Sequence, residues 1–89
     1  MCNLYEQNIA FRTRRLAGKD ILIGENKCYE LNEVAFEIWK YLDNEHTIDE
    51  IIEFISGEFS EDVNIIKQDV ITFTNSMLDS NAIRKVKDE

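Results

Sequence analysis

The hydrophobic pattern of this chain changes its period near Asn32. Before that residue, apolar and polar side chains alternate, which is the pattern of strands with one buried face. After it, apolar residues recur three and four positions apart, which is the pattern of amphipathic helices. Because strands come first and helices follow, we predict an α+β fold in which the helices cover one face of a small sheet.

Three short strands are expected before Asn32. Ile9, Phe11 and Thr13 share one face of the first strand, and Tyr29 and Leu31 share one face of the third. Brief turns join antiparallel neighbours, so the strands should form a three-stranded antiparallel meander. The expected strands cover residues 9–14, 20–23 and 27–31, with turns at Gly18 and at residues 24–26.

Three helices are expected after the strands. Asn32 is a good N-cap, and Thr47 with Glu50 forms a capping box at the start of the second helix. Asn81 can take the left-handed conformation that ends the third helix. The helices should begin at Asn32, at Thr47 and at residues 60–62, and end near residues 43–44, 59 and 80–81. Residues 82–86 should form a short extended tail.

Composition narrows the range of functions. The 89 residues suit one domain, residues 1–89, with a thin core. The formal net charge is −8, and residues 31–79 hold two lysines against twelve acidic residues. Such a surface repels phosphate backbones, so we expect no nucleic-acid partner. No stretch approaches the ~20 apolar residues of a membrane span, and we expect a cytoplasmic protein.

No pattern in the sequence supports catalysis or metal binding. Cys2 and Cys28 lack metal-ligand spacing and could form a disulfide, which a chain with a plausible core does not require. The single histidine, His46, precedes a helix cap and has no nucleophile in its own segment. The three glycines form no phosphate-binding loop. We therefore expect no enzyme activity, no cofactor and no metal.

The middle of the chain carries a recognisable run of residues. The run consists of Tyr29-Glu30-Leu31-Asn32, Ile38-Trp39, Leu42-Asp43 and Thr47-Ile48-Asp49-Glu50-Ile51. It resembles the PqqD-like family, and the similarity extends from an Arg-rich first strand to a third helix that contains Asp69 and Val70. One departure is Asn44, where such proteins often carry Gly after the Leu-Asp pair.

The resemblance implies a winged helix-turn-helix-like domain that recognises the precursors of ribosomally made, post-translationally modified peptides. Members bind the leader segment of a precursor peptide and deliver it to an enzyme. That enzyme is a radical SAM protein, a lasso-peptide leader protease or a cyclodehydratase. Some members are free-standing small proteins, which the length of this chain resembles.

The peptide-binding site follows from the third strand. If it lies at a sheet edge, an extended peptide can pair with it as an added strand, and pockets beside the third helix can accept side chains. For several of these residues a core role is the plainer interpretation, and the helix positions are carried over from the family by position only. The candidate residues are Lys27, Cys28, Tyr29, Glu30, Leu31, Ile66, Asp69, Val70, Phe73, Thr74 and Met77.

Two alternatives remain open at this stage. A winged-helix DNA-binding domain has similar elements, and its recognition helix would be the third helix, residues 62–79. That helix offers Lys67 and Gln68 but also three aspartates, which disfavours DNA. The edge strand could also pair with a second copy, giving a homodimer by sheet extension.

Overall fold

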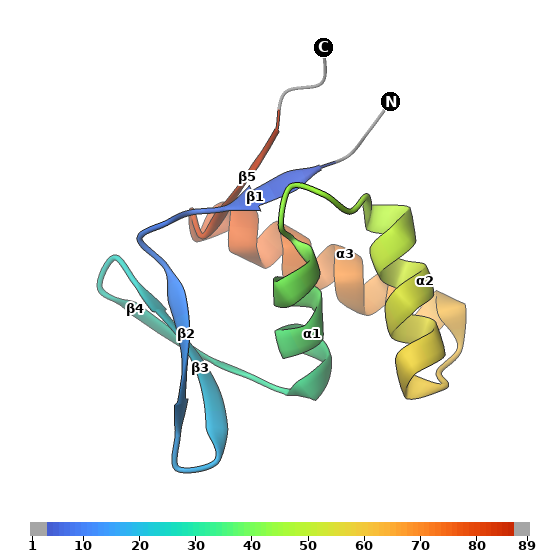
Figure 1. Cartoon of the computed structure of the whole chain (residues 1–89), viewed down its shortest axis with the longest axis horizontal. Coiled ribbons are helices and arrows are strands. Elements are labelled where there is room, and N and C mark those ends of the chain that lie inside the picture. Colours follow the sequence, from blue (N-terminus) through green and yellow to red (C-terminus); the bar gives the residue numbers. More distant parts are fainter. Residues whose placement is uncertain (1–3, 87–89) are drawn as a thin grey trace.

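The computed structural model describes residues 4–86, which form five strands and three helices (Figure 1). The helices lie to one side of a three-stranded sheet, and the two ends of the described chain run side by side as a short ribbon. The elements are β1 Tyr5–Gln7, β2 Arg12–Leu16, β3 Lys19–Gly24, β4 Lys27–Leu31, α1 Glu33–Tyr41, α2 Ile48–Phe59, α3 Val63–Asp79 and β5 Ile83–Lys85.

The three-stranded sheet has the predicted antiparallel order β2-β3-β4. Two-residue turns connect the strands. Ala17 and Gly18 have φ values of 52° and 78° in the first turn, and Glu25 and Asn26 have 48° and 64° in the second. Positive φ at both central residues is the turn geometry that matches the twist of a hairpin. The two turns thus hold the three strands in a tight meander.

The predicted start of the first strand is wrong. Ile9 lies in a turn and its side chain is fully exposed, at 101%. Asn8 creates this turn, because its side-chain oxygen accepts the backbone N–H of Ala10 and its carbonyl oxygen accepts that of Phe11. Such local bonds compete with strand pairing. Phe11 is buried, so the alternation holds only from that residue onward.

A strand that the sequence pattern did not reveal precedes this turn. β1 pairs with β5 in antiparallel register, with Glu6 opposite Arg84. Their side chains form a salt bridge. The extended tail predicted for residues 82–86 is therefore the partner of β1. This pairing joins the two ends of the described chain beside the helices (Figure 1).

The helix starts agree with the predicted caps. The Asn32 side-chain oxygen accepts the backbone N–H of Ala35 at 2.8 Å. Both bonds of the capping box are present, since Thr47 Oγ1 accepts the Glu50 N–H at 3.2 Å and Glu50 Oε1 accepts the Thr47 N–H at 2.8 Å. Asn81, just after α3, has φ of 66°. The helix boundaries thus follow from hydrogen bonds and backbone conformations of residues at the helix ends, which the sequence identifies.

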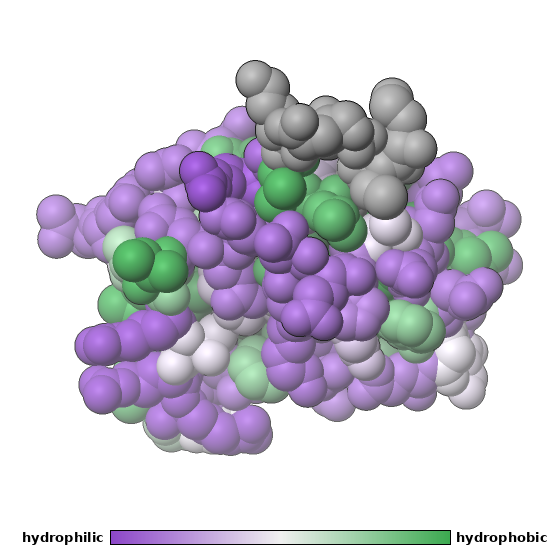
Figure 2. Space-filling model, turned by 45° about the horizontal axis from the view of Figure 1, so that its top comes forward, coloured by the Kyte–Doolittle hydropathy of each residue, from purple (hydrophilic) through white to green (hydrophobic). Residues whose placement is uncertain are grey.

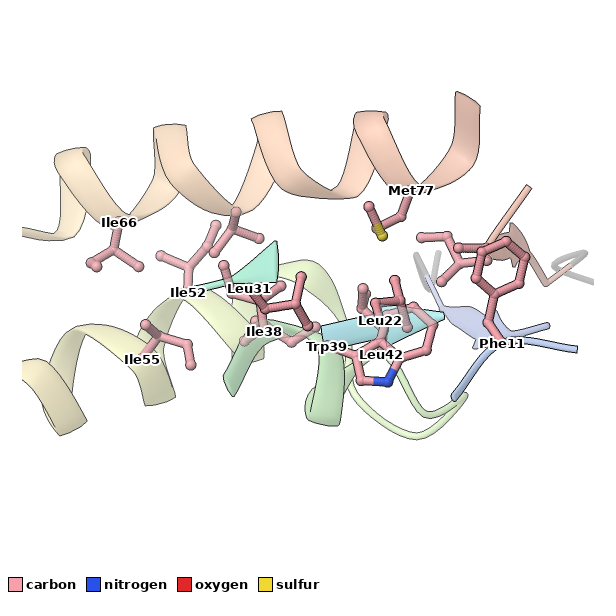
Figure 3. Packing of buried hydrophobic residues seen from close by; sticks show 14 residues of the cluster. Phe11, Leu22, Leu31, Ile38, Trp39, Leu42, Ile52, Ile55, Ile66 and Met77 are labelled. Atoms are coloured by element: carbon pink, nitrogen blue, oxygen red, sulfur yellow. The ribbon is translucent and has the colours of Figure 1, made fainter. Parts of the chain in front are cut away.

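The core lies between the inner face of the sheet and the helices. Leu22 at the centre of β3 is fully buried, and Leu31 at the end of β4 is 5% exposed. Of the α3 side chains, Ile66 points toward Ile52 and Ile55 of α2, and Met77 points toward Leu22 of the sheet (Figure 3). The other buried apolar residues are Phe11, Ile38, Trp39, Leu42, Ile51, Ile52, Ile55, Val70, Ala82 and Ile83.

The capping box gives a test of the fold. Replacing Thr47 with Ala removes the acceptor for the Glu50 N–H, so we expect the free energy of unfolding to fall by about 1 kcal/mol. Urea denaturation followed by circular dichroism measures the change. The control is Asn75→Ala, an exposed position inside α3. Equal stability of Thr47→Ala and wild type would contradict a stabilising role of this cap.

Candidate functional site

Strand β4 lies at one edge of the three-stranded sheet, as the sequence analysis expected. In an antiparallel edge strand, alternate residues direct their N–H and C=O groups away from the neighbouring strand. The side chains also alternate: Tyr29 is half-buried and Leu31 buried on the helix side, while Cys28 and Glu30 are exposed on the other side. β4 therefore combines an open backbone edge with an apolar inner face.

Two side-chain hydrogen bonds join β4 to the end of α3. The Lys27 ammonium donates to the carbonyl oxygen of Ser80 at 2.8 Å. The Tyr29 hydroxyl and the Ser80 hydroxyl are also 2.8 Å apart. Both contacts are partly buried. They hold the first half of β4 against the C-terminal end of α3 and limit how far the two elements can separate there.

A cavity of about 340 Å³ opens where β4 passes into α1. One wall comes from the first turns of α1 and the other from α3. Phe73 supplies an aromatic surface, and the Asp69 carboxyl group is exposed at the rim. The lining residues are Asn32, Val34, Ala35, Ile38, Asp69, Thr72, Phe73 and Ser76. Such a cavity suits one or two apolar side chains and has a negative charge at its edge.

Apart from Lys27, Cys28, Tyr29 and Glu30, which are exposed or half-buried on β4, the predicted site residues fall into two groups. Of the predicted helix residues, Asp69 and Phe73 line the cavity. The second group is buried, and these side chains belong to the core that supports the site. Thr74 Oγ1 has no hydrogen-bond partner within the part of the chain that the structure describes. The buried residues are Leu31, Ile66, Val70, Thr74 and Met77.

Several residues of the cavity were missed by the sequence analysis. Those from α1 could not be found, because their closeness to α3 depends on tertiary packing. On α3 a signal exists: Ile65, Asp69, Thr72 and Ser76 lie three and four positions apart and so share one helix face. Ile65 on this face is 54% exposed, although it does not itself line the cavity. The missed lining residues are Asn32, Val34, Ala35, Ile38, Thr72 and Ser76.

The surface around the core is mainly polar. On the face shown in Figure 2, exposed hydrophobic side chains form small separate areas within a hydrophilic surface. A partner that binds such a face gains little from broad apolar contact. Backbone pairing at β4, supported by a small apolar cavity, is a route to affinity that does not need a large hydrophobic patch.

The candidate reactive residues His46 and Cys28 belong to different segments, the loop before α2 and strand β4. His46 Nδ1 is 2.9 Å from Asp43 Oδ1, and this hydrogen bond raises the pKa of the histidine. The His46 ring also contacts the rings of Tyr41 and Phe54. Cys28 is exposed on β4, whereas Cys2 lies outside the described residues.

Neither a metal centre nor a membrane span was found in residues 4–86. Within that range, no three His, Cys, Asp or Glu residues are grouped so that they could hold a metal ion. No helix of the same range combines the length and the apolar character needed to cross a bilayer.

Comparison with known proteins links this arrangement to one family. The model of the family described as "Coenzyme PQQ synthesis protein D (PqqD)" matches residues 15–83, which include the whole of β4 and α3. No match was found among curated proteins.

Two solved structures are similar in fold. TbiB1, solved in complex with the TbiA(beta) leader peptide, has a TM-score of 0.76 and 19% identity, over 93% of this chain and 99% of that chain. The PqqD truncation of Methylobacterium extorquens PqqCD, solved by NMR and described as a stand-alone RiPP recognition element, has a TM-score of 0.76 and 17% identity. That alignment covers 91% of this chain and 88% of the other.

The contact between β4 and α3 can be tested by a double-mutant cycle. Tyr29→Phe and Ser80→Ala each remove one partner of a partly buried hydrogen bond, so each should lower the free energy of unfolding by about 1 kcal/mol. The double variant should lose less than the sum, because the two changes remove the same bond. Urea denaturation of the four proteins measures the coupling, and strict additivity would contradict the bond.

Proposed function

Because the chain belongs to the PqqD family, we propose that it binds the leader segment of a ribosomally made precursor peptide and presents it to a modifying enzyme. The open edge of β4 beside the cavity is the observation that carries this proposal. The fold agrees with it, since TbiB1 was solved with a leader peptide and has the same architecture.

The proposed mode of binding is strand addition. An extended leader lies alongside Lys27, Cys28, Tyr29, Glu30 and Leu31, and its backbone pairs with the N–H and C=O groups that alternate residues of this strand direct outward. Backbone pairing gives affinity with little demand on the peptide sequence. Alternate leader side chains then point toward the helices. Because a strand advances about 3.3 Å per residue, successive side chains on this face lie first beside Tyr29 and then beside the cavity. Selectivity comes from these side chains.

The helix side of the proposed site has a wall and a floor. Phe73 and Asp69 form the wall that a leader side chain touches directly. The floor consists of side chains that support the wall and hold its position without reaching the surface of the free chain. Those supporting residues are Leu31, Ile66, Val70, Thr74 and Met77.

The rim charge adds a preference. Asp69 is exposed at the cavity, whereas Glu30 lies on the outer face of β4 and is paired with Lys19 at 3.7 Å. A leader with an apolar residue in the cavity and a basic residue near Asp69 would fit both the cavity and its charged rim, because opposite charges at an interface favour the correct register. Leaders rich in acidic residues around the apolar anchor are disfavoured.

Leader binding is tested by an amide NMR titration with the leader of a precursor peptide encoded beside the gene. Phe73→Ala and Tyr29→Ala should weaken binding roughly tenfold, as loss of aromatic anchors does at interfaces. The matched control is Glu53→Ala on α2, an exposed position outside the β4 groove, which should bind as wild type. Shifts should concentrate in residues 27–31 and 63–77.

Two results would contradict the proposed site. Equal losses from all three variants, each shown to be folded, would remove the β4 groove from consideration. An absence of shifts with the leader, together with shifts on adding duplex DNA, would mean that the chain binds nucleic acid. Concentration-dependent sizing shows whether a second copy occupies the β4 edge as a homodimer instead.

We also propose that the chain acts by binding alone. The partner enzyme then carries out the reaction. The two classes of enzyme that we consider first are radical SAM proteins and lasso-type leader proteases. The purified chain should leave the precursor peptide unmodified, which mass spectrometry of the incubated peptide measures. The control reaction adds the partner enzyme. A mass change produced by the chain alone would refute this part of the proposal.

A further inference from the structure

The outer face of the three-stranded sheet carries a second ordered set of side chains. The antiparallel register places Ile23 between Arg12 and Cys28 in one row across the strands. The next row on the same face has Ile21 between Arg14 and Glu30. These residues alternate with the buried Leu22, so they point away from the helices.

This face is apolar at its centre. Ile21 and Ile23 are only half-buried, although isoleucine is among the residue types most often fully buried. Leu16 at the end of β2 is 49% exposed and pairs with Lys19. We call Arg12, Arg14, Leu16, Ile21 and Ile23 the outer-face strip.

The strip is also basic in an otherwise acidic chain, whose formal net charge is −8. Arg12 and Arg14 are exposed, and neither forms a salt bridge with any residue that the structure describes. Arg15, on the inner side of the same strand, is by contrast paired with Asp20 at 3.3 Å. The two guanidinium groups of the strip therefore keep their capacity to bind a carboxylate in the bidentate geometry that arginine favours.

We propose that the outer-face strip docks a partner protein whose contact surface carries carboxylates around an apolar centre. The aliphatic residues between the arginines favour a protein, since a protein interface has an apolar core and a polar rim. Nucleic acid is the weaker choice, because two arginines release few counterions and the rest of the chain repels phosphates.

The position of the strip indicates which partner it serves. Cys28 and Glu30 of β4 end the two rows of the outer face, whereas the cavity lies on the helix side of the same strand. A protein on the outer face is thus adjacent to a peptide on the β4 edge and does not cover the cavity. We assign the strip to the enzyme that receives the peptide, an assignment that rests on the proposed function.

The test uses the full chain and the purified modifying enzyme encoded beside the precursor peptide. Calorimetry should show that Arg12→Glu with Arg14→Glu weakens enzyme binding at least about tenfold, because the reversal places like charges together. The matched control reverses two exposed lysines elsewhere, Lys67→Glu with Lys85→Glu, and changes the net charge equally. It should stay within about twofold of wild type, and wild-type binding should weaken as salt is raised.

Arg12→Gln with Arg14→Gln serves as a milder variant, and circular dichroism checks that each variant is folded. Leader affinity, measured on the same variants, should be unchanged. The proposal is overturned if wild type does not bind the enzyme, or if both double reversals lose equally. It is also overturned if reversal of the strip abolishes only duplex DNA binding, or only self-association seen by sedimentation. If the chain does not bind the leader but still binds the enzyme through the outer-face strip, the proposed function is wrong and the docking surface is retained.

Discussion

The helices of this chain cover only one face of its sheet, and the rest of the structure depends on that constraint. Three strands are too few to form a core by themselves, so one face must pack against other elements. The inner face does so through Leu22, which has no exposed surface, and Leu31 at the end of β4. The outer face and the edge of β4 consequently remain at the surface and can bind partners.

Chain order explains why β4 is one of the two edges of the three-stranded sheet. The strands β2, β3 and β4 follow one another in a meander, and only Asn32 separates the end of β4 from the start of α1. Asn32 caps that helix, so the chain turns away from the sheet at once and no further strand of the meander follows β4. The same sharp turn places the first residues of α1 next to α3, which creates the cavity beside the strand.

Local signals made most of the fold predictable. The two hairpin turns, the caps at Asn32 and Thr47, and the end of α3 near Asn81 depend on residues close in sequence, and each was found from its pattern. β1 was not found, because three residues carry no periodicity and their pairing with β5 spans almost the whole chain. Ile9 was misplaced because alternation shows a strand's faces but not the residue where the strand starts.

The site was predictable only in part. The edge strand and its inner and outer faces followed from alternation, as Tyr29 and Cys28 illustrate. On α3, the apolar stripe identified core residues such as Val70, which is fully buried, whereas the cavity wall lies on the neighbouring face. Phe73 belongs to both, since it packs against the core and lines the cavity. A hydrophobic stripe on a helix identifies the residues that face the core, whereas the residues that line a groove lie beside that stripe.

The geometry also bears on the cost of binding a peptide. One half of β4 is held by the contacts of Lys27 and Tyr29 with Ser80, and its other end is held where Asn32 caps α1. A strand fixed at both ends loses little conformational freedom when a partner pairs with it, so most of the ordering cost falls on the peptide. The same rigidity keeps the rows of the outer face in register. Pairing at the edge and docking on the outer face can therefore occur together without a change in the sheet between them.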